Sequence, residues 1–574
     1  METGTPHDNV YSIAAGAAFV DALAAGILDR FGGDPAGLAD IRILLPTRRA
    51  CRALGEAFLR ATDGRPALLP TMTPIGDIDE DEIGFLASEE PGLTGMADLP
   101  PAMPPLRRQL LLSRMIMAQD VTMSAAHAAR LANELGRLID EVRTERLSFA
   151  DLENIVPERF SQHWQETLVF LQIVTEHWPA ILAEHGCLDA ADRRNQLIEA
   201  QIALWREAPP AGPVIAAGST GSIPATADLL ACVAGLETGL LILPGLDKTL
   251  DADSLDALGP SHPQYGMARL LRRIDLDIQD VVDWRAAPEN RNPRIDTVNG
   301  ALRPPATAAT VSLPPDIGPA FSGVRRIDCP GPQAEALSIA LMLREALEDE
   351  QRTAALITPD RRLARRVAAE LRRWDIDIDD SGGTPLADTL PGVFLRLTAD
   401  VVAADAAPVP VLAVLKHPLA AGGMDPASFR DRVREMELTV LRGARPIPGF
   451  AGLRDALRHI EPEAGVTLWA EDLEEIARPF TDLMRQRRVE PVALLEAHVT
   501  FAEKLAASDS ETGVERLWAG EAGEAAATLI NDLRSALEML PPLAGREWPA
   551  LLDALMAGMV VRPLYGRHPR LHIW

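Results

Sequence analysis

The sequence is short of lysine, and this shortage excludes one kind of site directly. Only three of the 574 residues are lysines, at Lys248, Lys416 and Lys504, and all other basic residues except histidine are arginines. A nucleotide-binding phosphate loop of the GxxxxGK[ST] type needs a lysine to reach the β- and γ-phosphates. Because no lysine precedes position 248, the first 247 residues cannot contain such a loop.

Cysteine is equally scarce, and its spacing excludes the common metal motifs. The four cysteines, Cys51, Cys187, Cys232 and Cys329, lie far apart and form no CxxC pair. Zinc and iron–sulfur sites require closer spacing or histidine partners. We therefore expect no metal site and no disulfide framework, as in proteins of a reducing cytosol.

Long apolar runs and an N-terminal signal are also missing. The chain begins METGTPHDN, which is polar, and no run of about 18 apolar residues follows anywhere in the sequence. We expect no membrane span and a cytoplasmic, nucleoid-associated location.

The balance of charge is strongly acidic. The formal net charge is −27 and the sequence pI is about 4.9. Phosphates would meet a repulsive field at long range, which argues against a chain that coats itself in nucleic acid. A local basic channel stays compatible with this total, because the distribution of charge matters more than its sum.

The first half of the chain alternates strands and helices around a helical segment. The apolar runs at 10–15 and 41–46 predict strands, and a helix follows from 48 with Thr47 as its N-cap. From 105 to 208 the apolar spacing is helical, and strands return at 213–219 and 240–247. We predict an α/β domain of residues 1–104 and 209–300 that carries a helical insertion at 105–208.

The second half repeats this arrangement. Residues 285–320 are rich in Pro, Ala and Asn and read as a connection, with 301–320 as the link between domains. We predict a second α/β domain at 321–395, a helical insertion at 396–560 and a return to the second domain at 561–574. The chain ends inside a predicted strand, so we expect a piece of a longer protein whose second sheet is incomplete. Two parallel-sheet, RecA-like domains with helical insertions are the layout of UvrD-like helicases.

The phosphate loop of such a motor is degenerate in this sequence. The loop after the first strand reads AAGAAFVDAL, in which Gly16 can make the turn but no second Gly, Lys or Ser/Thr follows. The one near-match, GLDKT at 245–249, places an aspartate before its lysine. The strand at 213–219 ends without the carboxylate pair that holds Mg²⁺. We therefore expect no catalytic residue, no bound cofactor and no metal in this chain.

The acidic run GDIDEDE at 76–82 is a poorer metal candidate than its composition suggests. It follows TPI and lacks the hydrophobic strand that positions catalytic carboxylates. A solvated loop or the start of a helix is the favoured interpretation.

Two arginine-rich helix starts each follow an apolar strand that ends in proline. Arginines beside the N–H groups of a helix N-terminus suit a phosphate backbone. The alternative is a solvated helix face with ion pairs to this acidic protein. The turn after the strand at 213–219 adds three hydroxyl residues. The candidate DNA-binding residues are Thr47, Arg48, Arg49, Arg52, Ser219, Thr220, Ser222, Arg361, Arg362 and Arg365.

Several segments resemble the AddB family of alphaproteobacteria, the B subunits of AddAB double-strand-break repair helicase–nucleases. The resemblance runs in order along nearly the whole chain. It is carried by ILLPTRRACRALGEAFLR at 43–60, the acidic run at 76–82, HWQETLVFLQIVTEHWPAILAE at 163–184, PVIAAGSTGSIPATADLL at 213–230, LLILPGLD at 240–247, the segment 355–386, LKHPLAA at 415–421 and YGRHPRLHIW at 565–574.

The resemblance implies a helicase fold with a decayed ATP site, similar in role to RecC. It implies binding of DNA ends and single-stranded DNA that pass from the AddA motor, which binds the ATP, and a part in reading the Chi signal. The family's C-terminal PD-(D/E)xK nuclease domain, with its cysteine-held iron–sulfur cluster, has no counterpart in this chain, and none of the four cysteines matches its ligands.

We therefore expect a non-motor DNA-binding subunit, in its N-terminal portion, that forms a heterodimer with AddA for recombinational repair. Two alternatives stay open. The full-length parent is an active ATP-dependent helicase or exonuclease subunit with a C-terminal nuclease, or the chain is a scaffold that binds only proteins.

Overall fold

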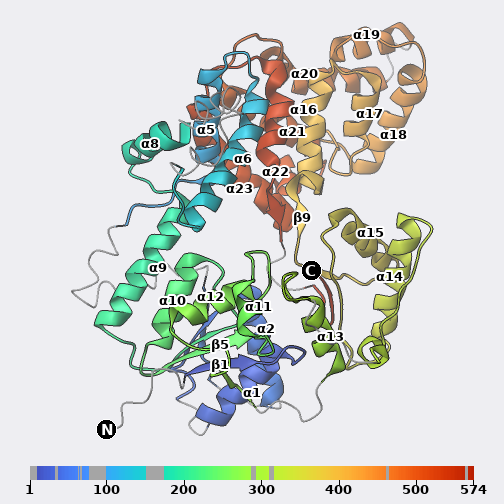
Figure 1. Cartoon of the computed structure of the whole chain (residues 1–574). Helices are drawn as coiled ribbons and strands as arrows, with labels where there is room; N and C mark the ends of the chain where they lie inside the picture. Colours follow the sequence, from blue (N-terminus) through green and yellow to red (C-terminus); the bar gives the residue numbers. More distant parts are fainter. Residues whose placement is uncertain are drawn as a thin grey trace. The chain divides into compact units, whose positions relative to one another are not determined.

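A computed structural model of the chain describes residues 9–32, 37–62, 64, 68–75, 99–149, 173–285, 292–308, 316–460, 465–562 and 567–574 (Figure 1). The chain divides into two compact units. Unit 1 comprises Met1–Met103, Leu138–Leu168 and Val174–Arg325, and unit 2 comprises Pro104–Arg137, Val169–Ile173 and Arg326–Trp574. The predicted helical insertion at 105–208 is thus divided between the two units.

A six-stranded parallel sheet forms the centre of unit 1. Its order is β3-β2-β4-β5-β1-β6, and every neighbouring pair is parallel. The strands are β1 (Val10–Ile13), β2 (Arg42–Leu45), β3 (Thr71–Pro74), β4 (Val214–Ala217), β5 (Gly239–Pro244) and β6 (Val282–Asp283). β4 is buried along its whole length, as its VIAA sequence predicts for a central parallel strand.

Helices cover both faces of this sheet. Alternate side chains of each strand point to opposite faces. Ile13, Ile43 and Ile215 belong to one core with α1 (Phe19–Phe31) and α2 (Arg48–Ala61). Val10, Leu44 and Val214 belong to a second core with α9 (Ala190–Glu207), α10 (Pro224–Ala234) and α12 (Tyr265–Arg273).

The direction in which the chain leaves each strand creates two switch points at one edge of the sheet. After β1 and β2 the chain enters α1 and α2 on one face, and after β4 and β5 it leads to α10 and α12 on the other face. Because β2 pairs with β4 and β5 pairs with β1, the chain diverges between the members of each pair. Crevices outside the carboxyl ends of strands at such switch points are where parallel sheets bind ligands.

Three shorter helices complete the described part of unit 1: α8 (Trp178–Glu184), α11 (Ala252–Asp256) and α13 (Pro293–Ala301). α13 lies within the segment that the sequence interprets as a connection, so that interpretation is wrong for residues 293–301. The helix starts at Pro293, with Asn292 as an N-cap that accepts a hydrogen bond from the N–H of Arg294 at 3.0 Å. A 3₁₀ turn, Gly318–Phe321, follows the next undescribed residues.

Unit 2 contains a smaller parallel sheet of order β7-β11-β8. Its strands are β7 (Ala354–Leu356), β8 (Asp379–Asp380) and β11 (Leu571–Ile573), and α14 (Pro332–Ala346) and α15 (Arg361–Leu371) pack on it. The predicted strand near the C-terminus is confirmed, because β11 lies between the other two strands. A separate antiparallel pair joins β9 (Thr384–Pro385) to β10 (Val560–Val561).

The remainder of unit 2 is helical, as its apolar periodicity predicts. The helices are α5 (Pro105–Gln119), α16 (Leu390–Ala403), α17 (Pro408–Leu415), α18 (Pro426–Met436), α19 (Phe450–Ile460), α20 (Gly465–Met484), α21 (Pro491–Ala506), α22 (Gly513–Leu517), α23 (Gly520–Ala536) and α24 (Trp548–Met556). One further helix, α6 (Ala125–Thr144), has residues in both units. The expected α/β class, mostly helical and with parallel sheets, is confirmed. No helix in the described ranges has both the length and the apolar character needed to cross a bilayer.

A fully buried histidine joins three helices of unit 2. The indole N–H of Trp548 donates to Nδ1 of His498 at 3.2 Å, so the other ring nitrogen, Nε2, carries the proton and faces the Thr398 hydroxyl at 2.8 Å. The ring also stacks on Phe480 with 4.9 Å between centroids. Burial lowers the pKa of His498 to about 4, which keeps it neutral in the folded protein.

The buried histidine makes the stability of unit 2 depend on pH. Below about pH 6.5 the unfolded chain binds a proton that the folded chain does not, so stability falls as the pH drops from there towards 4. From this group alone we expect a loss of about 2 kcal/mol between about pH 7.5 and pH 5. Urea unfolding measures it, and a His498→Gln variant should have a shallower dependence. Equal slopes for both proteins would contradict this assignment. His417, with a pKa also lowered by burial to about 4, and His568, whose pKa burial lowers as well, contribute to the slope that the variant retains.

Candidate nucleic-acid interface

A crevice of about 280 Å³ opens at the carboxyl ends of β2 and β4, and we name it the β2/β4 crevice. Its wall includes Ser219, Thr220 and Ser222 after β4 and Pro46 after β2. The remaining lining residues are Ile75, Arg194, Ile198, Gly218, Ile223 and Thr226. The structure thus brings the three predicted hydroxyl residues beside Pro46, which directly precedes Thr47. None of the described residues that line this crevice is acidic.

A sharp turn after β4 presents these hydroxyls. Gly218 has φ +78°, and its N–H donates to the Ile242 carbonyl at 3.0 Å. A Cβ at this position would lie 3.2 Å from the Phe19 ring, in a backbone conformation that side chains disfavour. The N–H of Gly221 then donates to the Ser219 hydroxyl at 3.4 Å. α10 starts at Pro224 without a side-chain cap. Ile223 and Thr226, at the start of this helix, line the crevice, so the positive end of the helix dipole lies there.

The start of α2 supplies the basic residues that the sequence singles out. Thr47 is extended, and its hydroxyl accepts a hydrogen bond from the N–H of Ala50 at 3.1 Å, which confirms the predicted N-cap. Arg48 and Arg52 are exposed and stand four residues apart, on one face of the helix, and Arg49 is half-buried. A helix N-terminus with arginines on its first turn is a place where phosphate oxygens bind.

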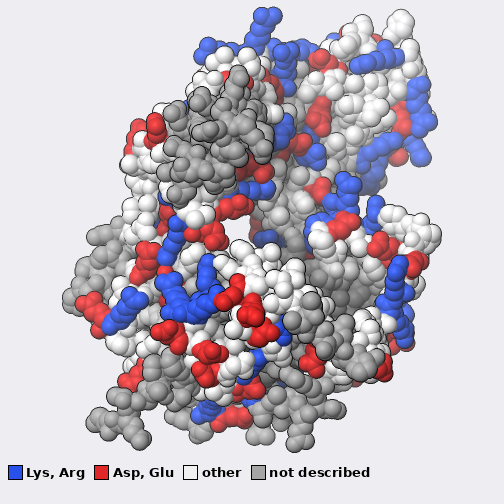
Figure 2. Space-filling model, in the orientation of Figure 1, with Lys and Arg blue, Asp and Glu red and all other residues white. Residues whose placement is uncertain are grey.

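Two further arginines of this region come from helices distant in sequence. Arg194 of α9 lines the crevice and donates to the Thr144 hydroxyl at 3.1 Å. Arg269 of α12 donates to the carbonyl of Ser222 at 3.1 Å. Figure 2 shows Lys and Arg side chains gathered over α9, α10 and α12 of unit 1. The sequence did not identify Arg194 or Arg269, because neither follows a strand and only the fold brings them to the turn after β4.

The candidate arginines of unit 2 lie beside acidic side chains. Arg361 forms an ion pair with Asp380 at 2.5 Å, and Arg365 pairs with Asp388. The Asp360 side chain caps α15 by accepting hydrogen bonds from the N–H groups of Arg362 and Leu363, which lower its pKa. These contacts correspond to the structural alternative that the sequence left open, in which acidic neighbours hold the arginines.

The degenerate phosphate loop lies in a second crevice, of about 350 Å³, at the carboxyl ends of β1 and β5. We name it the β1/β5 crevice. Gly16 has φ +82°, which confirms its predicted role as a turn residue. Ile295 of α13 covers it, since its Cδ1 is 3.1 Å from where a Cβ on Gly16 would lie. Lys248, from the near-match GLDKT, reaches this crevice but its ammonium pairs with Asp283 at 2.7 Å.

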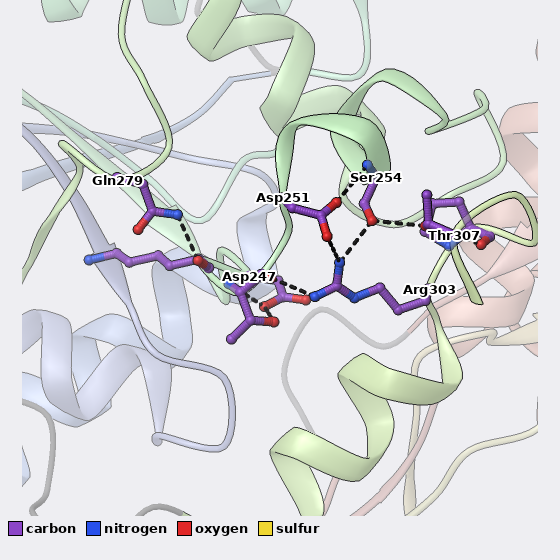
Figure 3. Close-up of polar contacts among 9 residues, drawn as sticks. Asp247, Asp251, Ser254, Gln279, Arg303 and Thr307 are labelled. Atoms are coloured by element: carbon purple, nitrogen blue, oxygen red, sulfur yellow. Dashed lines mark hydrogen bonds and ion pairs between the residues drawn. The ribbon is translucent and has the colours of Figure 1, made fainter. Parts of the chain in front are cut away.

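The loop after β5 is held in place by one arginine (Figure 3). The guanidinium of Arg303, whose side chain is 14% exposed, donates to the Ser254 hydroxyl at 2.8 Å and also to the Thr249 carbonyl, and it pairs with Asp251. The Ser254 hydroxyl lies 2.8 Å from that of Thr307. The segment after α13 therefore fixes the loop that forms one wall of the β1/β5 crevice.

The acidic run at 76–82 lies outside the described residues. A strand does precede it, because β3 ends at Pro74, but this is not the hydrophobic strand that the sequence argument finds missing. β3 is a partly exposed edge strand of sequence TMTP and not a buried hydrophobic one. Its pairing with β2, and not apolar alternation, makes it a strand. Across the described residues, no group of three or more His, Cys, Asp or Glu side chains could hold a metal ion.

All four cysteines are free thiols, and Cys232 is buried in the core on α10. No protein-family model and no curated protein matches the chain significantly.

Proposed function

We propose that this chain is the N-terminal, non-motor portion of an AddB-type subunit, which binds single-stranded DNA within a helicase–nuclease complex for recombinational double-strand-break repair. The single observation that carries the proposal is the β2/β4 crevice. Its lining combines the hydroxyl residues after β4 with Arg194, and none of its described residues is acidic. The start of α10 lies at the crevice, and the start of α2 follows the lining residue Pro46.

This set of groups suits a nucleic-acid backbone. Most protein contacts to DNA go to phosphate and sugar oxygens, and they come from arginine, hydroxyl side chains, backbone N–H groups and helix N-termini. Ser219 and Thr220 can donate to phosphate oxygens, while Arg194 supplies charge beside them. Because the total charge of the chain is −27, such a local concentration of arginine is the route by which DNA could bind.

The proposed UvrD-like architecture agrees with the two parallel sheets. In such a motor the loop after β1 would hold the phosphates and the end of β4 would hold the metal. Here the first position has Ala14, Ala15 and Ala17 around Gly16, and the second has Gly218 and Ser219. The missing phosphate-binding and metal-binding residues support a subunit that has the fold of a motor without its ATP site.

The proposed partner is an AddA motor, which would bind the ATP and deliver DNA to this chain in the cytoplasm. A role in reading a Chi-like signal belongs to the same proposal. The nuclease and the iron–sulfur cluster of the family belong to its C-terminal domain, and we assign neither to residues of this chain.

Replacing both Arg48 and Arg49 by alanine should weaken binding of oligothymidylate by about tenfold or more at low salt. Two lost phosphate contacts should also reduce the slope of log K against log salt by about 1.4, since each single-strand contact contributes about 0.7. Fluorescence anisotropy at several salt concentrations measures both quantities. The matched control is Arg60→Ala on the same helix, where Arg60 is paired with Asp21 at 2.6 Å and should not face DNA.

The proposal fails if the unaltered chain does not bind oligothymidylate, a result that would favour the protein-only scaffold. It also fails if the double variant binds with unchanged affinity and salt slope, or if Arg60→Ala weakens binding as much as the double variant does.

Hydrolysis of ATP is a separate test of the non-motor assignment. The chain with single-stranded DNA should release no phosphate from ATP above the background, because the described crevice at β1 and β5 offers no phosphate-binding lysine that is free of a carboxylate partner. A phosphate-release assay measures this, with a motor-competent helicase as the positive control. DNA-stimulated ATP hydrolysis that disappears in an Asp247→Asn variant would show that the chain has an active ATP site and would contradict the non-motor assignment.

A further inference from the structure

The two crevices of unit 1 differ in charge. The β2/β4 crevice is lined by Arg194 and by no described acidic residue, whereas Asp247, Asp283 and Asp296 line the β1/β5 crevice with Lys248 as the one cationic residue among the described lining. Figure 2 shows Asp and Glu side chains gathered over α11, which follows β5. An anion would be repelled from the β1/β5 crevice, and a cation would be attracted.

Asp247 is a buried residue whose carboxylate can accept further hydrogen bonds. The residue is only 6% exposed. Its Oδ1 accepts hydrogen bonds from the N–H of Thr249 at 2.9 Å and from the Thr249 hydroxyl at 2.6 Å. Its Oδ2 has no hydrogen-bond partner among the described residues, although the side chain lines the cavity. Oδ2 therefore keeps its capacity to accept hydrogen bonds from a ligand with N–H groups.

The surrounding residues make this acceptor rigid and leave its charge uncompensated. Lys248 is the nearest cation in sequence, but its ammonium is 2.7 Å from Asp283. The backbone on either side of Asp247 is tied down, because its own N–H donates to Gln264 at 3.2 Å and Gln279 donates to the Lys248 carbonyl at 2.8 Å (Figure 3). Together with the Arg303 contacts, these bonds preorganise the wall for a ligand.

The rest of the cavity suits an organic cation better than a metal ion. Ala15, Leu246 and Ile295 give it apolar walls, and the Asn299 amide lines it. The carboxylates do not converge, since the described residues contain no group of three metal-binding side chains. A planar guanidinium on an apolar stem matches both features, because it donates in parallel to carboxylate oxygens while its methylene groups lie against apolar surface.

We propose that the β1/β5 crevice binds a guanidinium group, with Asp247 as its principal acceptor and Ile295 packed against the stem. The guanidinium can come from an arginine side chain of a protein partner or from a free small molecule. This inference does not depend on the DNA contacts proposed above, so either can fail without the other.

Calorimetric titration of the chain with two probes tests the site. The probes are agmatine, a free guanidinium on an apolar stem, and N-acetyl-arginine amide, which imitates an arginine in a protein. N-acetyl-citrulline amide is the neutral control with the same shape. We expect at least one guanidinium probe to bind and the citrulline probe to bind at least tenfold more weakly. Preference for the capped arginine indicates a protein source, and preference for agmatine a free ligand.

Variants then locate the binding. Asp247→Asn should weaken it at least tenfold, and Asp256→Asn is the matched control because that carboxylate is 83% exposed on α11 and lies outside the crevice. Ile295→Trp, which fills the cavity and leaves the carboxylates intact, should also abolish binding, so the result does not depend on Asp247→Asn folding. The proposal is overturned if neither guanidinium probe binds the unaltered chain, if the citrulline probe binds equally well, or if every crevice variant that folds binds the probes normally.

Discussion

The parallel order β2-β4-β5-β1 is the constraint on which the rest of unit 1 depends. β4 is buried along its length and pairs on both sides, so the carboxyl ends of four strands open at one edge. Because the chain leaves β1 and β2 towards one face and β4 and β5 towards the other, two crevices form there, and both are occupied by loops with positive-φ glycines, Gly16 and Gly218. Neighbouring strands lie about 4.8 Å apart, so roughly 10 Å separates the two crevices.

The two neighbouring crevices differ in the charge of the side chains that line them. Hydroxyls and arginines gather after β2 and β4, and carboxylates gather after β5. An anionic phosphate is therefore electrostatically favoured at the first crevice and repelled at the second. Ile295 covers the loop after β1, and Arg303 holds the opposite wall in place.

Much of this fold could be predicted from the sequence, because buried strands such as VIAA at 214–217 are uninterrupted apolar runs and Thr47 has the side chain that an N-cap requires. What escaped prediction depends on tertiary contacts. β3 is a strand through its pairing with β2, and α13 buries none of its residues completely and is tied by Arg294 to the Ala320 carbonyl. Arg269 reaches the turn after β4 from a helix whose own sequence gives no sign of that turn. The strand-to-helix pattern at 361 and 365 also could not show that the fold places Asp380 and Asp388 beside these arginines.

Mapping the contacts of single-stranded DNA on the chain tests the central claim most directly. Photo-crosslinking of an oligonucleotide with halogenated bases, followed by mass spectrometry of the linked peptides, reports which crevice the DNA touches. The account predicts crosslinks in the peptides that contain residues 46–52 and 218–226, and none in those that contain 14–17 or 245–249. Crosslinks concentrated on the β1/β5 crevice, or confined to unit 2, would contradict it.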